Sequence, residues 1–186
     1  MGKRTRISYL SLSFALIATF ASMGCIFSKQ SGAGTLEPGF SMPPRSTLLL
    51  SQVPDGSGAD GVMPGSGELV RSGLGGELLK RGFQVFNSEA TQQQQLLDEA
   101  KSKGATFALL ARITIWEENA TSWSGKRDQA GISIQLYDVA TGALKGSSER
   151  TAHGVRHPNQ CAPWLTQTAV AAMFGEAVDD EAAPPC

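Results

Sequence analysis

His153 and His157 are the two residues whose spacing is closest to that of metal ligands in this chain. On a helix, side chains four positions apart share a face, and two histidines placed in this way can bind zinc. Gly154 lies between them and Pro158 follows, a context typical of a strand end and a loop. We therefore expect two solvated histidines and no metal site.

Three carboxylates beside two tryptophans form a second chemical candidate. Glu117, Glu118 and Asp128 flank Trp116 and Trp123, and paired carboxylates near aromatic rings can hydrolyse glycosidic bonds. Adjacent residues on a strand point to opposite faces, so Glu117 and Glu118 are poorly placed to act together. The pattern favours a hairpin with solvated acids and packed tryptophans, and it predicts no catalytic residue.

A glycine-rich loop over residues 55–61 holds two further acids, Asp55 and Asp60. The loop lacks the Gly-Lys-Ser/Thr ending of a phosphate-binding loop and the regularly spaced acidic ligands of a calcium loop. We expect it to bind neither a metal nor a cofactor.

The first 24 residues have the order of a secretory signal peptide. Lys3, Arg4 and Arg6 precede an uncharged stretch over 7–23, and Gly24 ends it. A membrane span needs about 20 apolar residues, and this stretch is shorter and contains several Ser and Thr residues. A cleaved signal over 1–24 is the favoured interpretation, and a transmembrane helix is the alternative.

The segment Ser22–Cys25 resembles the lipobox of bacterial lipoproteins, in which small residues precede a cysteine that is acylated and becomes the first residue of the mature chain. The resemblance implies cleavage between Gly24 and Cys25 and a lipid anchor, such as palmitate, on Cys25, although Ser22 stands where the family prefers Leu. Two or three acyl chains hold a protein firmly to a membrane. Lipoproteins with Asp after the cysteine stay in the inner membrane; Ile26 in that position implies the outer membrane.

Behind the signal, the hydrophobic periodicity predicts one α/β domain over 46–178, with a mixed sheet of about five strands and three helices. In the longest strand pattern, Ile113 and Ile115 are expected on one face and Trp116 on the other. The predicted order is strand 47–51, helix 66–81, strand 83–86, a helix that Ser88 or Thr91 begins and Gly104 ends, strands 105–118, 131–138 and 143–153, and a closing helix 163–178 with Pro163 in its first turn.

Two segments flank the predicted domain. Residues 25–45 are rich in Gly, Ser and Pro and predict a flexible tether, and residues 179–186 form a C-terminal tail. Lipidation of Cys25 would leave Cys161 and Cys186 as an even pair in an oxidising compartment. We expect these two to form a disulfide; the alternatives are two unbridged thiols or a Cys186 bridge between chains.

The net charge of the predicted mature chain argues against nucleic acid as a partner. The signal segment holds three of the 16 basic residues and none of the 17 acidic ones, so residues 25–186 carry a formal net charge of −4. Nucleic-acid-binding domains carry a basic patch or stripe. We therefore expect no nucleic-acid partner.

The stretch from Ile115 to Gly142, with its Trp-x6-Trp-Ser-Gly segment, resembles a family of bacterial lipoproteins known only as domain of unknown function 4823. The resemblance extends over about 48–174 and includes Gly65-Ser-Gly67 and the segment 100–105. The wider order of elements is similar to the amino-terminal domain of TolB and to lipoproteins of curli secretion and of penicillin-binding-protein activation. These resemblances imply a non-enzymatic adaptor or a pore subunit, on analogy of fold alone.

These observations together favour a non-catalytic lipoprotein whose periplasmic domain binds an envelope protein or a cell-wall component through its sheet edge and the hairpin over 116–128. Trp116, Trp123 and Lys126, in and beside the predicted hairpin loop, are the expected interaction surface, because buried aromatic side chains contribute much of the energy of interfaces. The alternatives are an oligomeric subunit of a secretion or surface assembly and, less favoured, a peptidoglycan hydrolase.

Overall fold

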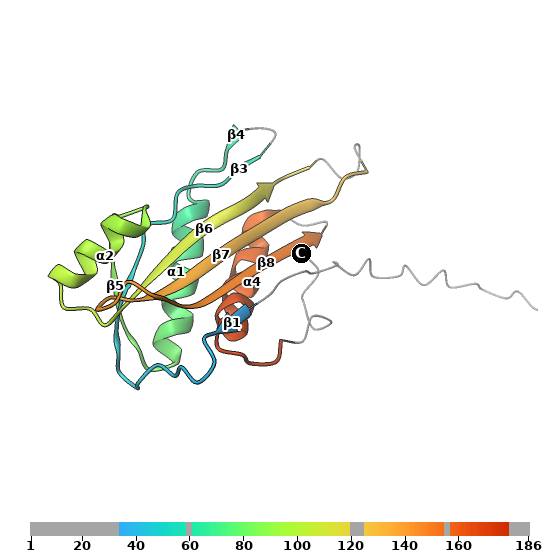
Figure 1. Ribbon diagram of the computed structural model, residues 1–186. Helices are drawn as coiled ribbons and strands as arrows, with labels where there is room; N and C mark the ends of the chain where they lie inside the picture. Colours follow the sequence, from blue (N-terminus) through green and yellow to red (C-terminus); the bar gives the residue numbers. More distant parts are fainter. Residues whose placement is uncertain (1–33, 59–60, 120–124, 155–156, 179–186) are drawn as a thin grey trace, which may run out of the picture.

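The computed structural model of the chain describes residues 34–58, 61–119, 125–154 and 157–178 (Figure 1). Six strands form one mixed sheet in the order β1-β8-β7-β6-β2-β5. β2 runs parallel to β5 and β6, and the other neighbours are antiparallel. The strands are β1 (Gly34–Leu36), β2 (Thr47–Leu50), β5 (Gln84–Asn87), β6 (Phe107–Glu117), β7 (Asp128–Asp138) and β8 (Leu144–Gly154), and a separate short hairpin consists of β3 (Ser57–Gly58) and β4 (Gly61–Val62).

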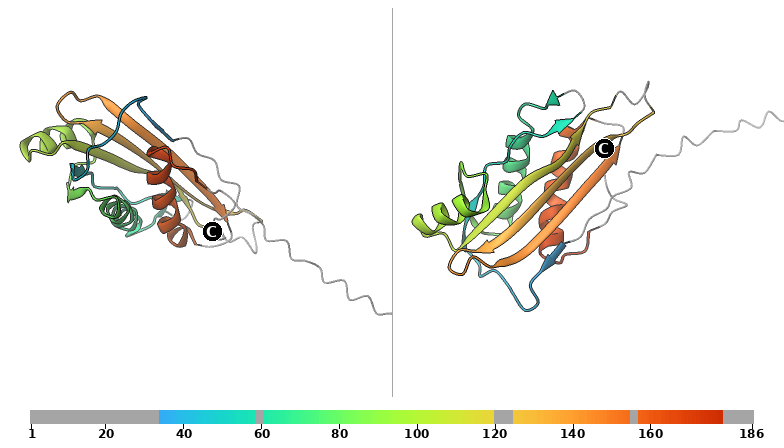
Figure 2. Two further views of the ribbon diagram at one scale, coloured as in Figure 1. Left: turned by 90° about the horizontal axis from the view of Figure 1, so that it is seen from below. Right: turned by 45° about the horizontal axis from the view of Figure 1, so that its top comes forward.

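Three helices in the described residues cover the two faces of the sheet unequally. α1 (Ser66–Lys80) and α4 (Pro158–Met173) lie side by side on one face, while the shorter α2 (Gln93–Ser102) packs on the other face near β2 (Figure 2). None of the helices in the described ranges therefore covers most of the outer face of β7 and β8. None of these helices combines the length and the apolar composition of a membrane span.

Alternating side chains of the strands build two hydrophobic clusters. On β2, Leu48 and Leu50 belong to the cluster with α1 and α4, whereas Leu49 belongs to the cluster with α2. On α1 the buried apolar residues recur every fourth position, at Val70, Leu74 and Leu78, which is the spacing of one helical face.

The predicted fold class and element order are confirmed, with one strand more than expected. The additional strand is β1, and it lies inside the segment 25–45 that the sequence predicted to be a flexible tether. That prediction is wrong from Gly34 onward, because β1 pairs with β8 and because Phe40 and Met42 pack against the main core. The predicted signal peptide over 1–24 and the first residues of the tether lie outside the described residues.

The prediction for the face of Trp116 is also wrong. Ile113 pairs with Ile132, but Ile115 pairs with the next residue, Gly131, so the strand contains a β-bulge between them. A bulge adds a residue to one strand and resets its alternation. Trp116 consequently turns into the core with 0% exposure, and Ile115 lies on the opposite face, against Gly131.

The closing helix begins earlier and ends earlier than predicted. Pro158 occupies its first turn, and the Nδ1 atom of His157 accepts the N–H of Asn159 at 3.1 Å, so these two residues start the helix. Pro163 is inside the helix instead of at its start. Gly175 adopts a positive φ of 72° just after the helix, where the chain reverses.

Candidate functional site

In the described part of the chain, the sheet has two open edges, each formed by a strand with a neighbouring strand on one side only. β5 ends the sheet on one side and β1 ends it on the other, and within the described residues no further strand pairs with either. Open edges present unpaired N–H and C=O groups and are natural sites for strand addition. We call them the β5 edge and the β1 edge.

The β5 edge exposes both backbone groups and apolar side chains. Gln84 and Ser88 donate their N–H groups to Ser46 and Leu50, at 3.0 and 2.9 Å. Because backbone groups alternate in direction along a strand, those of Val85 and Asn87 point away from the sheet. The side chain of Phe86 is 55% exposed between them.

Hollows lie on both sides of the β5 edge. The hollow beside α1 measures about 310 Å³ and is lined by Gly75, Gly76 and Leu79, the last 58% exposed. The hollow beside α2 measures about 270 Å³, and its lining residues are Thr47, Leu49, Phe86, Lys103 and Ala105.

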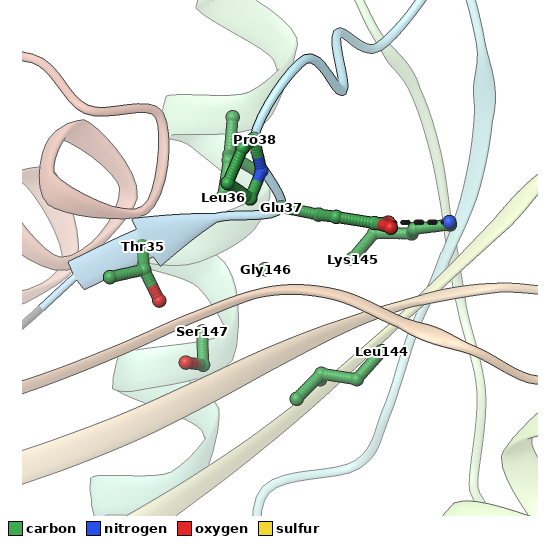
Figure 3. A pocket seen from close by; sticks show the side chains of 8 residues that line it. All are labelled: Thr35, Leu36, Glu37, Pro38, Leu144, Lys145, Gly146 and Ser147. Atoms are coloured by element: carbon green, nitrogen blue, oxygen red, sulfur yellow. Dashed lines mark hydrogen bonds and ion pairs between the residues drawn. The ribbon is translucent and has the colours of Figure 1, made fainter.

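The β1 edge borders a third hollow, of about 330 Å³, on the face of the sheet that α2 partly covers (Figure 3). Glu37 extends along its rim to Lys145, with Oε2 and Nζ 2.5 Å apart. The N–H of Glu37 donates to the carbonyl of Lys145 at 2.8 Å, so the backbone groups of Thr35 also face β8. The backbone groups of Gly34 and Leu36 therefore point outward.

The turn between β7 and β8 fixes the far wall of this hollow. Asp138 Oδ1 accepts hydrogen bonds from the hydroxyl and the N–H of Thr141, at 2.7 and 2.8 Å. These bonds hold the pKa of Asp138 below its ordinary value. The turn places Leu144, 48% exposed, beside Lys145 at the hollow.

The charged groups at both edges are paired. Glu37 pairs with Lys145, and Glu99 pairs with Lys103 at 2.6 Å. Hydrogen bonds from Lys103 and then from Ser88 lower the pKa of Glu99. Burial raises the pKa of Tyr137, on the same face of the sheet. Such groups can orient a bound chain, but among the described residues neither edge brings together a nucleophile and a base.

The three residues of the predicted interaction surface differ in placement. Trp116 is buried and donates its indole N–H to Asn159 Oδ1 at 3.1 Å, so it holds β6 to α4 and is not a contact surface of the folded domain. Trp123 lies outside the described residues. Lys126 is exposed at the end of the β6–β7 hairpin.

The predicted carboxylate cluster has mainly structural partners. Asp128 is 6% exposed, and its Oδ1 accepts the backbone N–H of Asn119 at 2.6 Å. Glu118 lies 3.2 Å from His157 Nε2, while Glu117 pairs in register with Gln129 on β7. These contacts tie the hairpin to its neighbours.

The histidines and the glycine-rich loop also have structural positions. His153 lies on β8 opposite Gln129, whereas His157 caps α4 with a side chain that is 36% exposed, so His157 has a structural role in addition to its contact with solvent. Asp55 accepts the N–H groups of Gly65 and Gly67 at 3.1 and 2.8 Å, and thus satisfies the start of α1. Asp60 lies outside the described residues, and within those residues no three potential ligands are grouped as a metal site would require.

The cysteines are only partly described. Cys161 is 3% exposed on α4, and Cys25 and Cys186 lie outside the described residues. After Gly175 the chain returns along α4, since Val178 and Trp164 line the same cavity of about 440 Å³. The last described residue, Val178, thus lies beside the helix that carries Cys161, and the disulfide between Cys161 and Cys186 stays a prediction.

Sequence reasoning expected binding at a sheet edge but did not identify the two strands that form the edges. Gly34–Leu36 is too short and too glycine-rich a segment to give a periodic signal. Phe86 belongs to a recognised strand pattern, but its exposure follows from the position of β5 at the end of the sheet, which depends on long-range pairing.

A comparison of the sequence with protein-family models and with curated proteins gives no match, so membership of the domain family 4823 and the similarity to TolB are not confirmed. Solved structures do match. The PelC dodecamer from Paraburkholderia phytofirmans aligns with a TM-score of 0.60 at 17% identity, over 81% of this chain and 100% of that chain. A single-residue variant of the same dodecamer gives a TM-score of 0.58 at 18% identity, over 77% and 98%.

Lipoprotein GNA1162 from Neisseria meningitidis aligns less well, with a TM-score of 0.49 at 13% identity over 70% of this chain and 99% of that chain. At such identities the likeness concerns the fold alone. The described domain therefore has the fold of a PelC subunit, with a sheet that ends in two open edges.

Proposed function

We propose that this chain is a lipid-anchored subunit of a self-assembled, non-catalytic complex in the bacterial cell envelope. The observation that carries the proposal is the alignment with PelC, a protein solved as a dodecamer, over the whole length of the PelC chain. Most homo-oligomers form closed rings or dihedral assemblies, which require complementary surfaces on each subunit. The two open edges of this domain are surfaces of that kind.

The contacts of the candidate catalytic residues favour an assembly role over hydrolysis. Asp128 and Asp55 accept backbone N–H groups, and His157 caps a helix. A glycosidase needs two carboxyl groups facing each other across a substrate cleft. Near the hairpin, Asp128 instead accepts a backbone N–H, and Glu118 lies beside His157.

The proposed anchor is the acylated Cys25. Gly34, where the sheet begins, follows Cys25 by nine residues. Nine extended residues span at most about 30 Å. The anchor therefore holds the β1 edge near the membrane surface, and Ile26 after the cysteine favours the outer membrane.

The β6–β7 hairpin supports a second candidate, an adaptor that binds another envelope protein or a cell-wall component. The exposure of Lys126 and of its neighbours Gly125 and Arg127 favours it. In that case Trp123→Ala should weaken capture of a partner from solubilised envelopes and leave the melting temperature nearly unchanged. A large loss of stability would instead place Trp123 in the core.

Chemical crosslinking in intact membranes tests the assembly proposal. The full-length chain is treated with an amine-reactive crosslinker, which reaches exposed lysines such as Lys80 and Lys101. We expect a ladder of covalent multimers that stops at one largest species and is unchanged when expression is lowered tenfold. Membranes denatured before treatment are the control and should give monomer. Monomer alone in native membranes would refute the proposal.

A further inference from the structure

We propose that the β5 edge of one copy pairs antiparallel with the β1 edge of the next copy, so that the sheet continues from subunit to subunit. This inference rests on the proposed self-assembly and names its interface. It makes the contact heterologous, with different surfaces on the two sides, and such contacts generate closed rings when the rotation between subunits closes.

The strand directions satisfy the first requirement. β5 runs parallel to β2 and to β6, and the three following steps to β7, β8 and β1 are each antiparallel. β1 therefore runs opposite to β5. Two copies whose sheets continue in the same sense bring these edges together as an antiparallel pair, which is the more stable kind of ladder.

The outward backbone groups select one register. Val85 and Asn87 present theirs on the β5 edge, and Gly34 and Leu36 present theirs on the β1 edge. In an antiparallel ladder, residues of a hydrogen-bonded pair exchange both bonds. Placing Val85 opposite Leu36 puts Asn87 opposite Gly34, so all four residues are satisfied. A shift of two residues in either direction leaves only one such pair between the described strands.

The same register matches the side chains on the face that carries α2. Phe86 lies on that face, because its β2 partner Leu49 belongs to the cluster with α2. Thr35 lies on it too, since it pairs with Ser147 while the adjacent Gly146 faces Met173 of α4. Phe86 thus stands opposite Thr35 and can enter the hollow at the β1 edge.

This hollow offers the exposed ring an apolar wall. Pro38 and Leu144 line it, and Leu144 is itself 48% exposed (Figure 3), whereas the side chain of Leu36 packs against the main core on the other face of the sheet. One position along, the exposed amide of Gln84 stands opposite Glu37 and can donate to its carboxylate. The pairing would therefore cover Phe86 and Leu144, two of the large apolar side chains that the described domain leaves exposed.

An engineered disulfide tests the register directly. In a non-hydrogen-bonded antiparallel pair the Cα atoms lie about 4.5 Å apart, within the range that a disulfide accepts. Within one chain, residues 35 and 86 are separated by five strand spacings, or about 24 Å, so they cannot bridge internally. Phe86→Cys also removes the ring and weakens the contact, but a disulfide, once formed, traps each pair that meets. The full-length double variant Thr35→Cys with Phe86→Cys should therefore accumulate a ladder of disulfide-linked multimers in oxidised membranes.

Each single variant is a control and should give no ladder beyond the wild-type background from the native cysteines. The pair Thr35→Cys with Val62→Cys is a matched control, because Val62 is 64% exposed but lies on β4, away from both edges. A ladder from this pair as strong as that from the first would overturn the register.

The substitution Phe86→Lys tests the energetic role of the ring. A central aromatic side chain contributes a large part of the binding free energy of an interface. Its loss should therefore raise the subunit dissociation constant at least thirty-fold. Circular dichroism should be unchanged because the side chain is largely exposed. In one outcome, wild-type multimers form while the double-cysteine variant gives no ladder and Phe86→Lys assembles normally. That result would refute the proposed interface and leave the proposed self-assembly intact. If the wild-type chain is monomeric in membranes, both are wrong.

Discussion

Replacing Trp116 by alanine distinguishes a core residue from a contact residue. The bulge in β6 turns this side chain into the cluster with α1 and α4, where it is 0% exposed. A methyl group added at Gly56 would lie 2.5 Å from its Cβ, and its indole N–H bonds to Asn159. The residue therefore joins β6 to α4 and to the loop before β3.

The expected loss follows from this burial. Truncation of a buried tryptophan to alanine costs about 3–5 kcal/mol, because it removes apolar contacts and leaves a cavity. For a domain of this size each kcal/mol lowers the melting temperature by about 3–4 °C. Trp116→Ala should thus lower it by roughly 10–20 °C. Trp116→Phe keeps most of the packing and loses the indole hydrogen bond, at a smaller cost of about 1–2 kcal/mol.

Thermal unfolding followed by circular dichroism measures these shifts in the detergent-extracted protein. Lys126→Ala is the control, because this exposed hairpin residue should change stability by less than about 0.5 kcal/mol. A melting temperature of Trp116→Ala within 2 °C of the wild type would refute the burial of Trp116 and restore it to the surface of the hairpin.

Three further predictions concern the chain ends and one turn. Cys25→Ser should release the protein from membranes or leave an uncleaved precursor in cell fractionation, and a mature, membrane-bound variant would place the anchor elsewhere. Thiol labelling of the denatured, unreduced mature chain should find Cys161 and Cys186 unreactive, because they form a disulfide. This disulfide closes a loop of about 25 residues and should add roughly 3.5 kcal/mol to the free energy of unfolding. Two reactive thiols per chain would contradict the prediction. Asp138→Asn should lower the melting temperature most near neutral pH. The pKa of Asp138 is lowered in the folded state, so its carboxylate stabilises the fold above its unfolded pKa of about 4, and this contribution disappears as the pH falls through the folded value. An equal difference between variant and wild type at pH 7 and pH 3 would exclude that role.

The sequence predicts the element types well because each depends on local periodicity. Leu74 and Leu78 repeat at a helical spacing, and the long alternation over residues 105–113 gives a strand. The alternation predicts the wrong face for Trp116, because the β-bulge before Ile115 depends on the residue that lies opposite on β7. Gly131 lacks a side chain there, and a Cβ at that position would lie 2.7 Å from Ile115 Cγ2.

The β1 edge and the β5 edge could not be predicted from local sequence patterns, because they too depend on pairing between distant segments. β1 has three residues, among glycines and prolines, and only its pairing with β8 shows that it is a strand. Phe86 belongs to an apolar strand segment like any core residue, and its exposure appears only once β5 is placed at the end of the sheet. Sheet order and edge position follow from contacts distant in the sequence, which no short window contains.

Native mass spectrometry of the full-length chain, extracted from membranes in a mild detergent, tests the proposed self-assembly most directly. Assembly through two unlike edges of one sheet predicts a single closed species of fixed copy number, which persists on dilution and shifts toward monomer in Phe86→Lys. A wild-type chain that is monomeric at micromolar concentration would contradict the proposal.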